Sequence, residues 1–189
     1  MQSEHVGKLR GPTDKPIRIE YVAMPRSIIV GTMRQAVHKI VSGGQTGVDR
    51  AALDVALELG ISIGGWVPKG RLAEDGELSV RYRDLVESDE SSSELRTRLN
   101  VGSSDSTLVL TTANKSKGTE LTILTAGNFS KPVCVVNVDK SDVSIREAAN
   151  EIRDWLQIQK PIVLNVAGPR ASEWSAPHFA GQAAVGFRH

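Results

Sequence analysis

Residues 42–47 read Ser-Gly-Gly-Gln-Thr-Gly and combine glycine with small polar side chains, as anion-binding turns do. An apolar run precedes this loop and a helical pattern follows it. Its free N–H groups would therefore lie at a helix start, where the helix dipole favours a phosphate or a carboxylate. Arg50 falls in the first helical turn, where a cation opposes the dipole unless an anion lies nearby, whereas Asp49 has the sign that stabilises the helix start. The predicted ligand contacts in this region are Ser42, Gly43, Gly44, Gln45, Thr46, Gly47 and Arg50.

Two later turns have a related composition. Residues 117–119 read Lys-Gly-Thr between an apolar run and a helical pattern, and residues 168–170 read Gly-Pro-Arg after the last apolar run. Taken alone, each turn has an ordinary explanation, because Thr119 can cap a helix and Arg170 can form a surface ion pair. Together with the first loop they predict one composite site, in which the forked guanidinium of Arg170 suits a phosphate or a carboxylate. The residues assigned to this site are Gly118, Thr119, Gly168 and Arg170.

The segment 64–76 mixes glycine, an aromatic residue and both signs of charge, which predicts a long loop rather than a helix or a core strand. Lys69 and Arg71 could face an anion. Glu74 and Asp75 could bind a ribose hydroxyl, a metal or a proton. The alternative is a solvated loop with local ion pairs. We interpret the segment as part of the ligand site.

The elements that would position these residues alternate between strand and helix. Strands are predicted at 39–42, 61–67, 85–87, 107–111, 133–138 and 162–166. Helices are predicted at 48–59, 92–101, 119–128 and 145–156, with a short helix within 177–185. This alternation predicts an α/β, Rossmann-like, doubly wound and mainly parallel sheet with helices on both faces. The run 133–138 is the one we predict to be the central strand. In such sheets, ligands bind beyond the carboxyl ends of the strands.

The chain divides near residue 37. Residues 1–37 carry six Lys or Arg and three Asp or Glu, a net charge of +3, and they contain three of the eight prolines. This composition predicts a poorly ordered N-terminal extension. A mis-assigned start, with Met33 as the true first residue, is the alternative. Residues 38–189 are predicted to form one domain.

Composition excludes several classes of protein. With 189 residues, 40% hydrophobic and 24% charged, the chain matches a globular domain, not a disordered or membrane protein. A net charge of +1 gives no field that would attract nucleic acid or an anionic membrane. The single cysteine, Cys134, cannot form a disulfide within the chain and lies in an apolar run, so we predict a buried, inert thiol and no metal site. The N-terminal residues lack a signal-peptide pattern, so we expect a cytoplasmic protein.

Four motifs resemble those of a known family. They lie at 42–54, 64–76, 96–101 (Arg-Thr-x-x-Asn-Val) and 164–173. In this order they are similar to the molybdenum carrier proteins, the circularly permuted YpsA-like branch of the SLOG superfamily, which also contains the LONELY GUY phosphoribohydrolases and the DNA-processing protein DprA. The resemblance covers about residues 38–175. It implies a Rossmann-like fold, a homo-oligomer (dimer or tetramer) and a site for a nucleotide-like or pterin-phosphate ligand, such as a nucleotide or the molybdenum cofactor.

The resemblance leaves two classes of function open. The first is a binding protein for a phosphorylated, nucleotide-like small molecule, without chemistry. The second is a nucleoside-monophosphate phosphoribohydrolase of the LONELY GUY type, which uses a Gly-Thr-x-x-Glu loop. Here Thr122 stands where that glutamate is expected, and the catalytic candidates that remain are Glu74, Asp75 and Glu120. We therefore favour binding over catalysis.

Overall fold

The computed structural model describes residues 37–89, 92–112, 115–138 and 142–173. The extension predicted for residues 1–37 lies outside this part of the chain, apart from Val37, which is buried in the core. The short helix predicted within 177–185 also lies outside it. Of the helices in the described ranges, none is long and apolar enough to cross a membrane.

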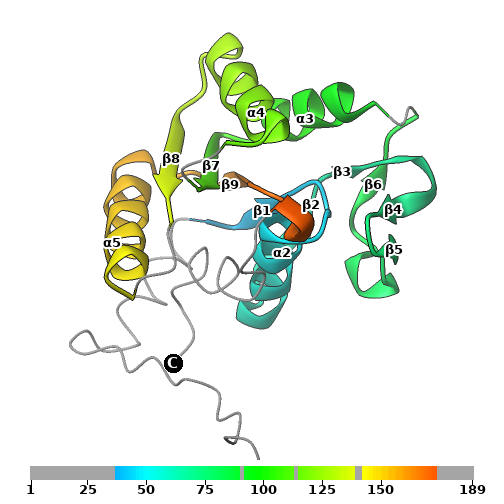
Figure 1. Cartoon of the computed structure of the whole chain (residues 1–189), viewed down its shortest axis with the longest axis horizontal. Coiled ribbons are helices and arrows are strands. Elements are labelled where there is room, and N and C mark those ends of the chain that lie inside the picture. The colour runs from blue at the N-terminus through cyan, green and yellow to red at the C-terminus, as the bar shows by residue number, and fades with distance from the viewer. Residues whose placement is uncertain (1–36, 90–91, 113–114, 139–141, 174–189) are drawn as a thin grey trace, which may run out of the picture.

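A five-stranded sheet forms the centre of the molecule, with strand order β2-β1-β9-β7-β8 (Figure 1). Its strands are β1 (Lys39–Val41), β2 (Ser62–Gly64), β7 (Ser106–Thr111), β8 (Val133–Asn137) and β9 (Val163–Ala167). Every neighbouring pair in this sheet is parallel. The predicted α/β fold with a mainly parallel sheet is therefore confirmed.

The strand predicted to be central, at 133–138, is instead the edge strand β8. That prediction is wrong because an uninterrupted apolar run does not reveal the order of strands in a sheet. The last strand, β9, inserts between β1 and β7, where Leu164 pairs with both Ile40 and Ser106. In β8, buried residues alternate with half-buried ones. Cys134 is buried as predicted, and burial raises the pKa of its thiol to about 11.

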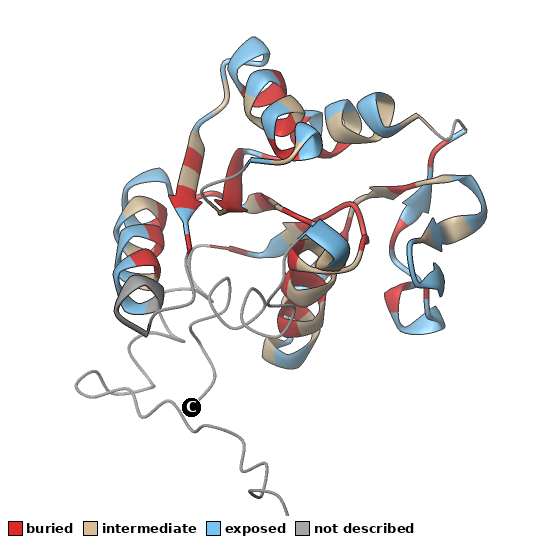
Figure 2. Cartoon of the chain, viewed as in Figure 1, coloured by how far each residue is buried: buried red, intermediate tan, exposed pale blue. Residues whose placement is uncertain are grey.

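Helices cover both faces of the sheet: α2 (Val48–Leu59) and α5 (Asp142–Gln159) lie on one, and α3 (Ser93–Gly102) and α4 (Lys117–Asn128) on the other (Figure 1). Their bounds agree with the predicted helices to within three residues. Between the sheet and the pair α2 and α5 lies an apolar core that includes Leu108, Leu110, Val136 and Ile152. Figure 2 shows the buried central strands between helices whose outer sides are exposed.

The face under α4 is more polar than its counterpart. Three buried threonines of α4, at 119, 122 and 125, lie on this side of the fold, and Thr107 and Asn165 are buried in the sheet. Asn165 donates a hydrogen bond from Nδ2 to Thr107 Oγ1 at 3.3 Å. Buried polar groups of this kind can satisfy one another or a ligand, so this face is chemically suited to a polar site.

The segment between β2 and α3 is not the plain loop predicted for 64–76. Strand β3 (Trp66–Val67) pairs in parallel with β6 (Val86–Glu87), and β4 (Leu72–Ala73) forms a hairpin with β5 (Gly76–Glu77). Short 3-10 turns η1 (Lys69–Arg71) and η2 (Val80–Tyr82) complete this segment, and η3 (Ala171–Glu173) follows β9. A second apolar cluster packs this segment against α2 through Val67, Leu78, Tyr82, Leu85 and Leu53.

Candidate ligand-binding site

A polar cavity of about 310 Å³ lies at the carboxyl ends of β1, β7 and β9. The loops after these three strands and one side of α3 form its walls. The chain runs from β1 to β2 on one side of this point and from β7 to β8 on the other, with β9 between them. Open α/β sheets bind their ligands at such a reversal of strand order. The volume is at the lower end of the range for small-molecule sites.

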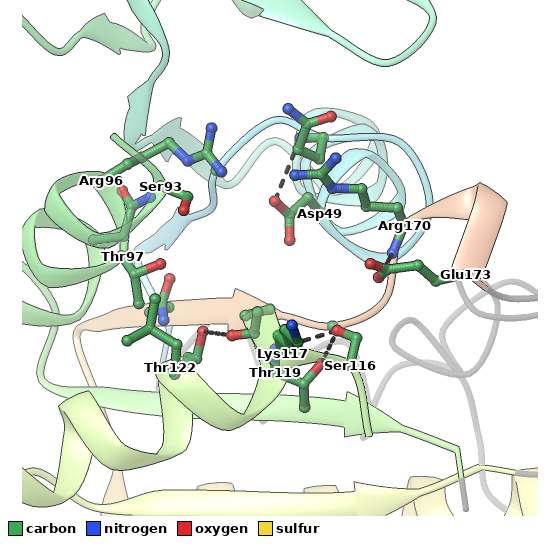
Figure 3. A pocket seen from close by; sticks show the side chains of 18 residues that line it. Asp49, Ser93, Arg96, Thr97, Ser116, Lys117, Thr119, Thr122, Arg170 and Glu173 are labelled. Carbon is green, nitrogen blue, oxygen red and sulfur yellow. Dashed lines mark hydrogen bonds between the residues drawn. The ribbon is translucent and has the colours of Figure 1, made fainter. Parts of the chain in front are cut away.

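Five charged residues line the cavity, and three of them approach one another: Asp49 from the first turn of α2, Arg96 from α3 and Arg170 from the turn after β9. The other two are Lys117 and Glu173, whose carboxylate accepts from the Arg170 N–H at 3.1 Å. Both arginine side chains extend toward Asp49, from opposite sides (Figure 3). The glycine at position 43 permits this approach. A Cβ on Gly43 would lie 2.8 Å from Asp49 Oδ2, 3.5 Å from Arg96 Nε and 3.7 Å from Asn100 Nδ2.

Burial dominates the electrostatics of Asp49 and raises the pKa of its carboxyl group to about 6. Four contributions oppose burial without cancelling it: the charge of Arg96, the hydrogen bond from the Gln45 amide (3.3 Å from Oδ2), a hydrogen bond with the Ser42 side chain, and the charge of Arg170. A carboxyl group in this range exchanges its proton near neutral pH. The charge of the cavity therefore depends on pH.

Arg96 is half-buried, and burial lowers the pKa of its guanidinium; Asp49 opposes this effect, and the like charge of Arg170 adds to it. In the part of the chain that the structure describes, no ion pair within 4 Å joins Asp49 to either arginine. Arg96 and Arg170 thus both lie near the Asp49 carboxylate without forming an ion pair with it, and their like charges repel each other. An anion between them would relieve that repulsion.

Two contacts at α3 position Arg96. Ser92 caps the helix, accepting a hydrogen bond at its Oγ from the Leu95 amide at 3.3 Å. Asn100 pairs with the backbone of Trp66, accepting from its N–H at 2.7 Å and donating to its carbonyl oxygen at 3.1 Å. The second contact fixes α3 against β3, so the face of α3 that carries Arg96 is held toward the cavity.

The start of α4 forms the wall opposite Asp49 (Figure 3). Ser116 caps this helix, accepting at Oγ from the Thr119 amide at 3.3 Å. Thr122 donates from Oγ1 to the Gly118 carbonyl oxygen at 2.9 Å. Lys117 and Gly118 line the cavity at this helix start, which adds an ammonium group and the positive end of the helix dipole.

The structure brings together part of the predicted site. The predicted residues that line the cavity are Gly43, Gln45, Gly118, Thr119, Gly168 and Arg170. They come from all three of the glycine-containing turns. The remaining predicted residues are not among those that line it.

Arg50 uses its guanidinium within the protein. It forms a bidentate ion pair with Asp75, with both N–O distances at 3.2 Å, and it donates to the Gly44 carbonyl oxygen. Its guanidinium carbon also lies 5.3 Å from the centre of the Tyr82 ring. The anion that the sequence required near this helix start is thus the side chain of Asp75.

The two predicted cations of the segment 64–76 also lie outside the lining. Arg71 donates to the carbonyl oxygens of Leu85 and Tyr82 at 3.0 and 2.9 Å, which closes the segment between β3 and β6. Lys69 is exposed in η1. Neither side chain is placed at the cavity.

The residues of the glycine-rich loop that do not line the cavity contact the elements around it. Ser42 donates from Oγ to the Val166 carbonyl oxygen at 2.8 Å, which ties the loop to β9. Thr46 donates to Glu74, and Gly47 packs against the backbone of Pro169. Of the proposed catalytic carboxylates, Glu74 and Asp75 are thus held by protein groups. The third, Glu120, is exposed on α4 and is not among the lining residues.

Sequence reasoning did not single out Asp49, Arg96 or Lys117 as ligand contacts. Asp49 was interpreted as a helix-stabilising charge, because its burial could not be seen in the sequence. Arg96 does stand in the motif Arg-Thr-x-x-Asn-Val, which contains both Arg96 and Asn100. That motif was the sequence signal for the wall of the cavity formed by α3.

Within the described residues, no cluster of three or more His, Cys, Asp or Glu could hold a metal ion.

Comparison with known proteins agrees with the fold and the motifs. The model of the circularly permuted YpsA SLOG family matches residues 40–185. The crystal structure of a protein named "Putative molybdenum carrier protein", from Syntrophus aciditrophicus SB, is similar with a TM-score of 0.74 and 40% sequence identity. The alignment covers 81% of this chain and 95% of that one. No curated protein matches the chain significantly.

Proposed function

The chain belongs to the circularly permuted YpsA SLOG family, and we propose that it is a binding protein for a phosphorylated, nucleotide-like ligand. One observation carries the proposal: Arg96 and Arg170 face a cavity of about 310 Å³ without an ion-pair partner within 4 Å among the described residues. Two cations close enough to repel each other, of which Arg96 is half-buried and Arg170 is exposed, favour an anionic ligand.

The cavity offers different chemistry to the two ends of such a ligand. Arg96 and Arg170 can bind a phosphate, and Lys117 with the N-terminus of α4 adds positive charge from the opposite wall. Thr97 on α3, Thr122 on α4 and Asn165 on β9 also line the cavity and carry hydroxyl and amide groups. These groups suit the hydroxyls and ring nitrogens of a nucleoside.

The molybdenum cofactor and a nucleotide each contain a phosphate group, and the residues of the cavity fit that group. Its donors are guanidinium, ammonium, hydroxyl and amide groups, and the acidic residues among its described lining are Asp49 and Glu173. Such donors suit phosphate oxygens, not a metal ion. We therefore propose that a pterin cofactor, like a nucleotide, is held through its phosphate, and we assign no protein ligand to the metal.

Isothermal titration calorimetry with AMP, GMP and inorganic phosphate tests this proposal. We expect the wild type to bind at least one of the nucleotides, and Arg96→Ala and Arg170→Ala each to weaken that binding about tenfold or more. Arg98→Ala is the matched control, because Arg98 is an exposed arginine on α3 that does not line this cavity. Equal affinities for all four proteins, or no binding to the wild type, would contradict the proposal.

A second candidate function is hydrolysis of the N-glycosidic bond of a nucleoside monophosphate, and Asp49 favours it. A carboxyl group with a pKa of about 6 inside a cavity can donate a proton to a leaving base. Incubation with a panel of nucleoside monophosphates would then release free base, and Asp49→Asn would abolish the release. If no base is released from any member of the panel, the binding function remains.

A further inference from the structure

One exposed carboxylate, that of Glu74, joins three segments that are far apart in the sequence. Its Oε1 accepts hydrogen bonds from Thr46 Oγ1 and from the Ser172 amide, the latter at 3.2 Å. Its Oε2 accepts from Ser172 Oγ at 2.7 Å. The hairpin β4–β5, the glycine-rich loop 42–47 and η3 are therefore fastened together at this side chain.

The backbone on both sides of Arg170 is fixed by the same loop. The Ala171 amide donates to Thr46 Oγ1 at 3.2 Å, and the Val48 amide donates to the Pro169 carbonyl oxygen at 3.3 Å. Gly47 lies so close beneath this stretch that a Cβ there would be 2.5 Å from the Pro169 carbonyl oxygen. Thr46 thus contacts both Glu74 and the residue that follows Arg170.

We propose that Glu74 is a positioning residue for Arg170: by holding Thr46 and Ser172 together, its carboxylate fixes the turn from which Arg170 reaches into the cavity. The inference rests on the proposed binding function, because the residue that Glu74 positions, Arg170, is proposed to bind the phosphate. Glu74 itself is not among the residues that line the cavity.

The hairpin that carries Glu74 is held in place independently. The neighbouring residue Asp75 forms the bidentate pair with Arg50 on α2. The Glu74 amide also donates to Gln45 Oε1 at 3.2 Å, and Gln45 lines the cavity. The carboxylate of Glu74 is thus presented from a hairpin fixed at two points, so it can fix η3 in turn.

The charge of Glu74 is suited to this role at neutral pH. The hydrogen bond from Thr46, followed by that from Ser172, holds the pKa of its carboxyl group below the usual value. The ionised form accepts all three hydrogen bonds, whereas protonation turns one acceptor site into a donor. We expect the contact to persist at neutral pH and to be lost as the pH falls through the lowered pKa.

A double-mutant cycle separates positioning from a general structural effect. Glu74→Gln keeps the shape of the side chain and removes its charge, and Glu77→Gln on β5 is the matched control in the same hairpin. Calorimetry with AMP and GMP should show about fivefold weaker binding for Glu74→Gln in the wild-type background. In the Arg170→Ala background the same substitution should have no effect, because its consequence passes through Arg170. Equal weakening in both backgrounds, or none in either, would overturn the proposal.

A readout without ligand keeps this inference separable from the proposed function. Hydrogen exchange of the unliganded protein should be faster at residues 171–173 in Glu74→Gln than in the wild type and in Glu77→Gln, while exchange in α5 stays the same. If the wild type binds no nucleotide but this local change is seen, the binding function fails and the fastening of η3 stands. If protection at 171–173 is unchanged, Glu74 does not hold this turn and the inference fails.

Discussion

Arg50 lies in the first turn of α2, directly after the glycine-rich loop 42–47, and Arg170 lies in the glycine-containing turn after β9. Both are at the carboxyl end of the parallel sheet, yet their surroundings differ. Arg50 has an ion pair with Asp75, two hydrogen bonds to the Gly44 carbonyl oxygen and the face of Tyr82. Arg170 has its backbone fixed, in part because its N–H donates to Glu173 Oε2 at 3.1 Å. Its guanidinium is directed toward the cavity, where Asp49 and Arg96 are charged neighbours and Glu173 also lines the wall.

The difference shows that an arginine near a glycine-rich turn is not by itself evidence of a ligand contact. The Arg50 guanidinium stabilises the loop that shapes the cavity. The Arg96 and Arg170 guanidiniums lack such partners within 4 Å among the described residues, so their charge is available to a ligand. Stability should therefore depend on the first arginine, and affinity on the other two.

The largest expected effect is on affinity, in the double variant Arg96→Ala/Arg170→Ala. Each charge-assisted hydrogen bond to a phosphate contributes about 1.5–3 kcal/mol, so nucleotide binding should weaken on the order of 100-fold or more. The free energy of unfolding should change by less than about 1 kcal/mol, because the variant removes both the repulsion between the two arginines and their attraction to Asp49. Calorimetry and urea denaturation measure the two quantities. A large loss of stability with unchanged affinity would show that Arg96 and Arg170 stabilise the fold and do not bind the ligand.

Gly47→Ala should disturb both regions at once. Gly47 has φ of 79°, and a Cβ there would lie 2.5 Å from the Pro169 carbonyl oxygen, so the backbone must move. We expect a loss of about 3 kcal/mol in the free energy of unfolding, together with weaker nucleotide binding. Gly127→Ala is the control, because a Cβ at Gly127 in α4 has no neighbour within 4 Å. Similar stability for the two variants would show that the close approach of the two turns does not matter.

Asp49→Asn sharpens the electrostatic side of the comparison. Because burial raises the pKa of Asp49 from 3.8 to about 6, the folded state binds this proton more tightly than the unfolded state does. Stability from this group is present below about pH 4 and is lost as the pH rises to about 6, by roughly 2–3 kcal/mol. Asp49→Asn should remove this pH dependence and raise stability at pH 7. Urea denaturation between pH 4 and 7 measures it, and identical profiles for the two proteins would exclude a buried, titrating Asp49.

Arg50→Ala should have the smallest effect on binding and a moderate one on folding. Removal of the bidentate pair with Asp75, which is half-exposed, and of the contact with Gly44 should cost about 1–2 kcal/mol of unfolding free energy. Nucleotide affinity should fall by less than about threefold, because the cavity keeps Arg96 and Arg170. A loss of affinity as large as that of Arg170→Ala would place Arg50 at the ligand after all.

Much of the fold could be predicted from the sequence, because local patterns determine it. The helix that starts at Val48 and ends at Gly60 follows from apolar spacing and a glycine stop, and the structure has it there. The position of β8 could not be predicted, since it depends on where β9 inserts, about 30 residues later. The homo-oligomer and the cytoplasmic location stay predictions.

The site was predictable where glycine marks a turn and not where long-range pairing decides the role of a charge. Gly43, Gly118 and Gly168 line the cavity from three separate turns. The partner of Arg50, by contrast, is Asp75, 25 residues away in the chain. Nothing in the spacing of the two residues distinguishes a pair within the protein from two contacts to a ligand.

The central claim is that Arg96 and Arg170 hold a phosphorylated, nucleotide-like ligand in this cavity. Its most direct test is mass spectrometry of the small molecules released from the purified native protein, compared with Arg96→Ala/Arg170→Ala and with Arg98→Ala. We predict a phosphorus-containing, nucleotide-like or pterin-like compound that accompanies the wild type and Arg98→Ala and is absent from the double variant. The same compound in all three proteins, or a bound compound without phosphorus, would contradict the claim.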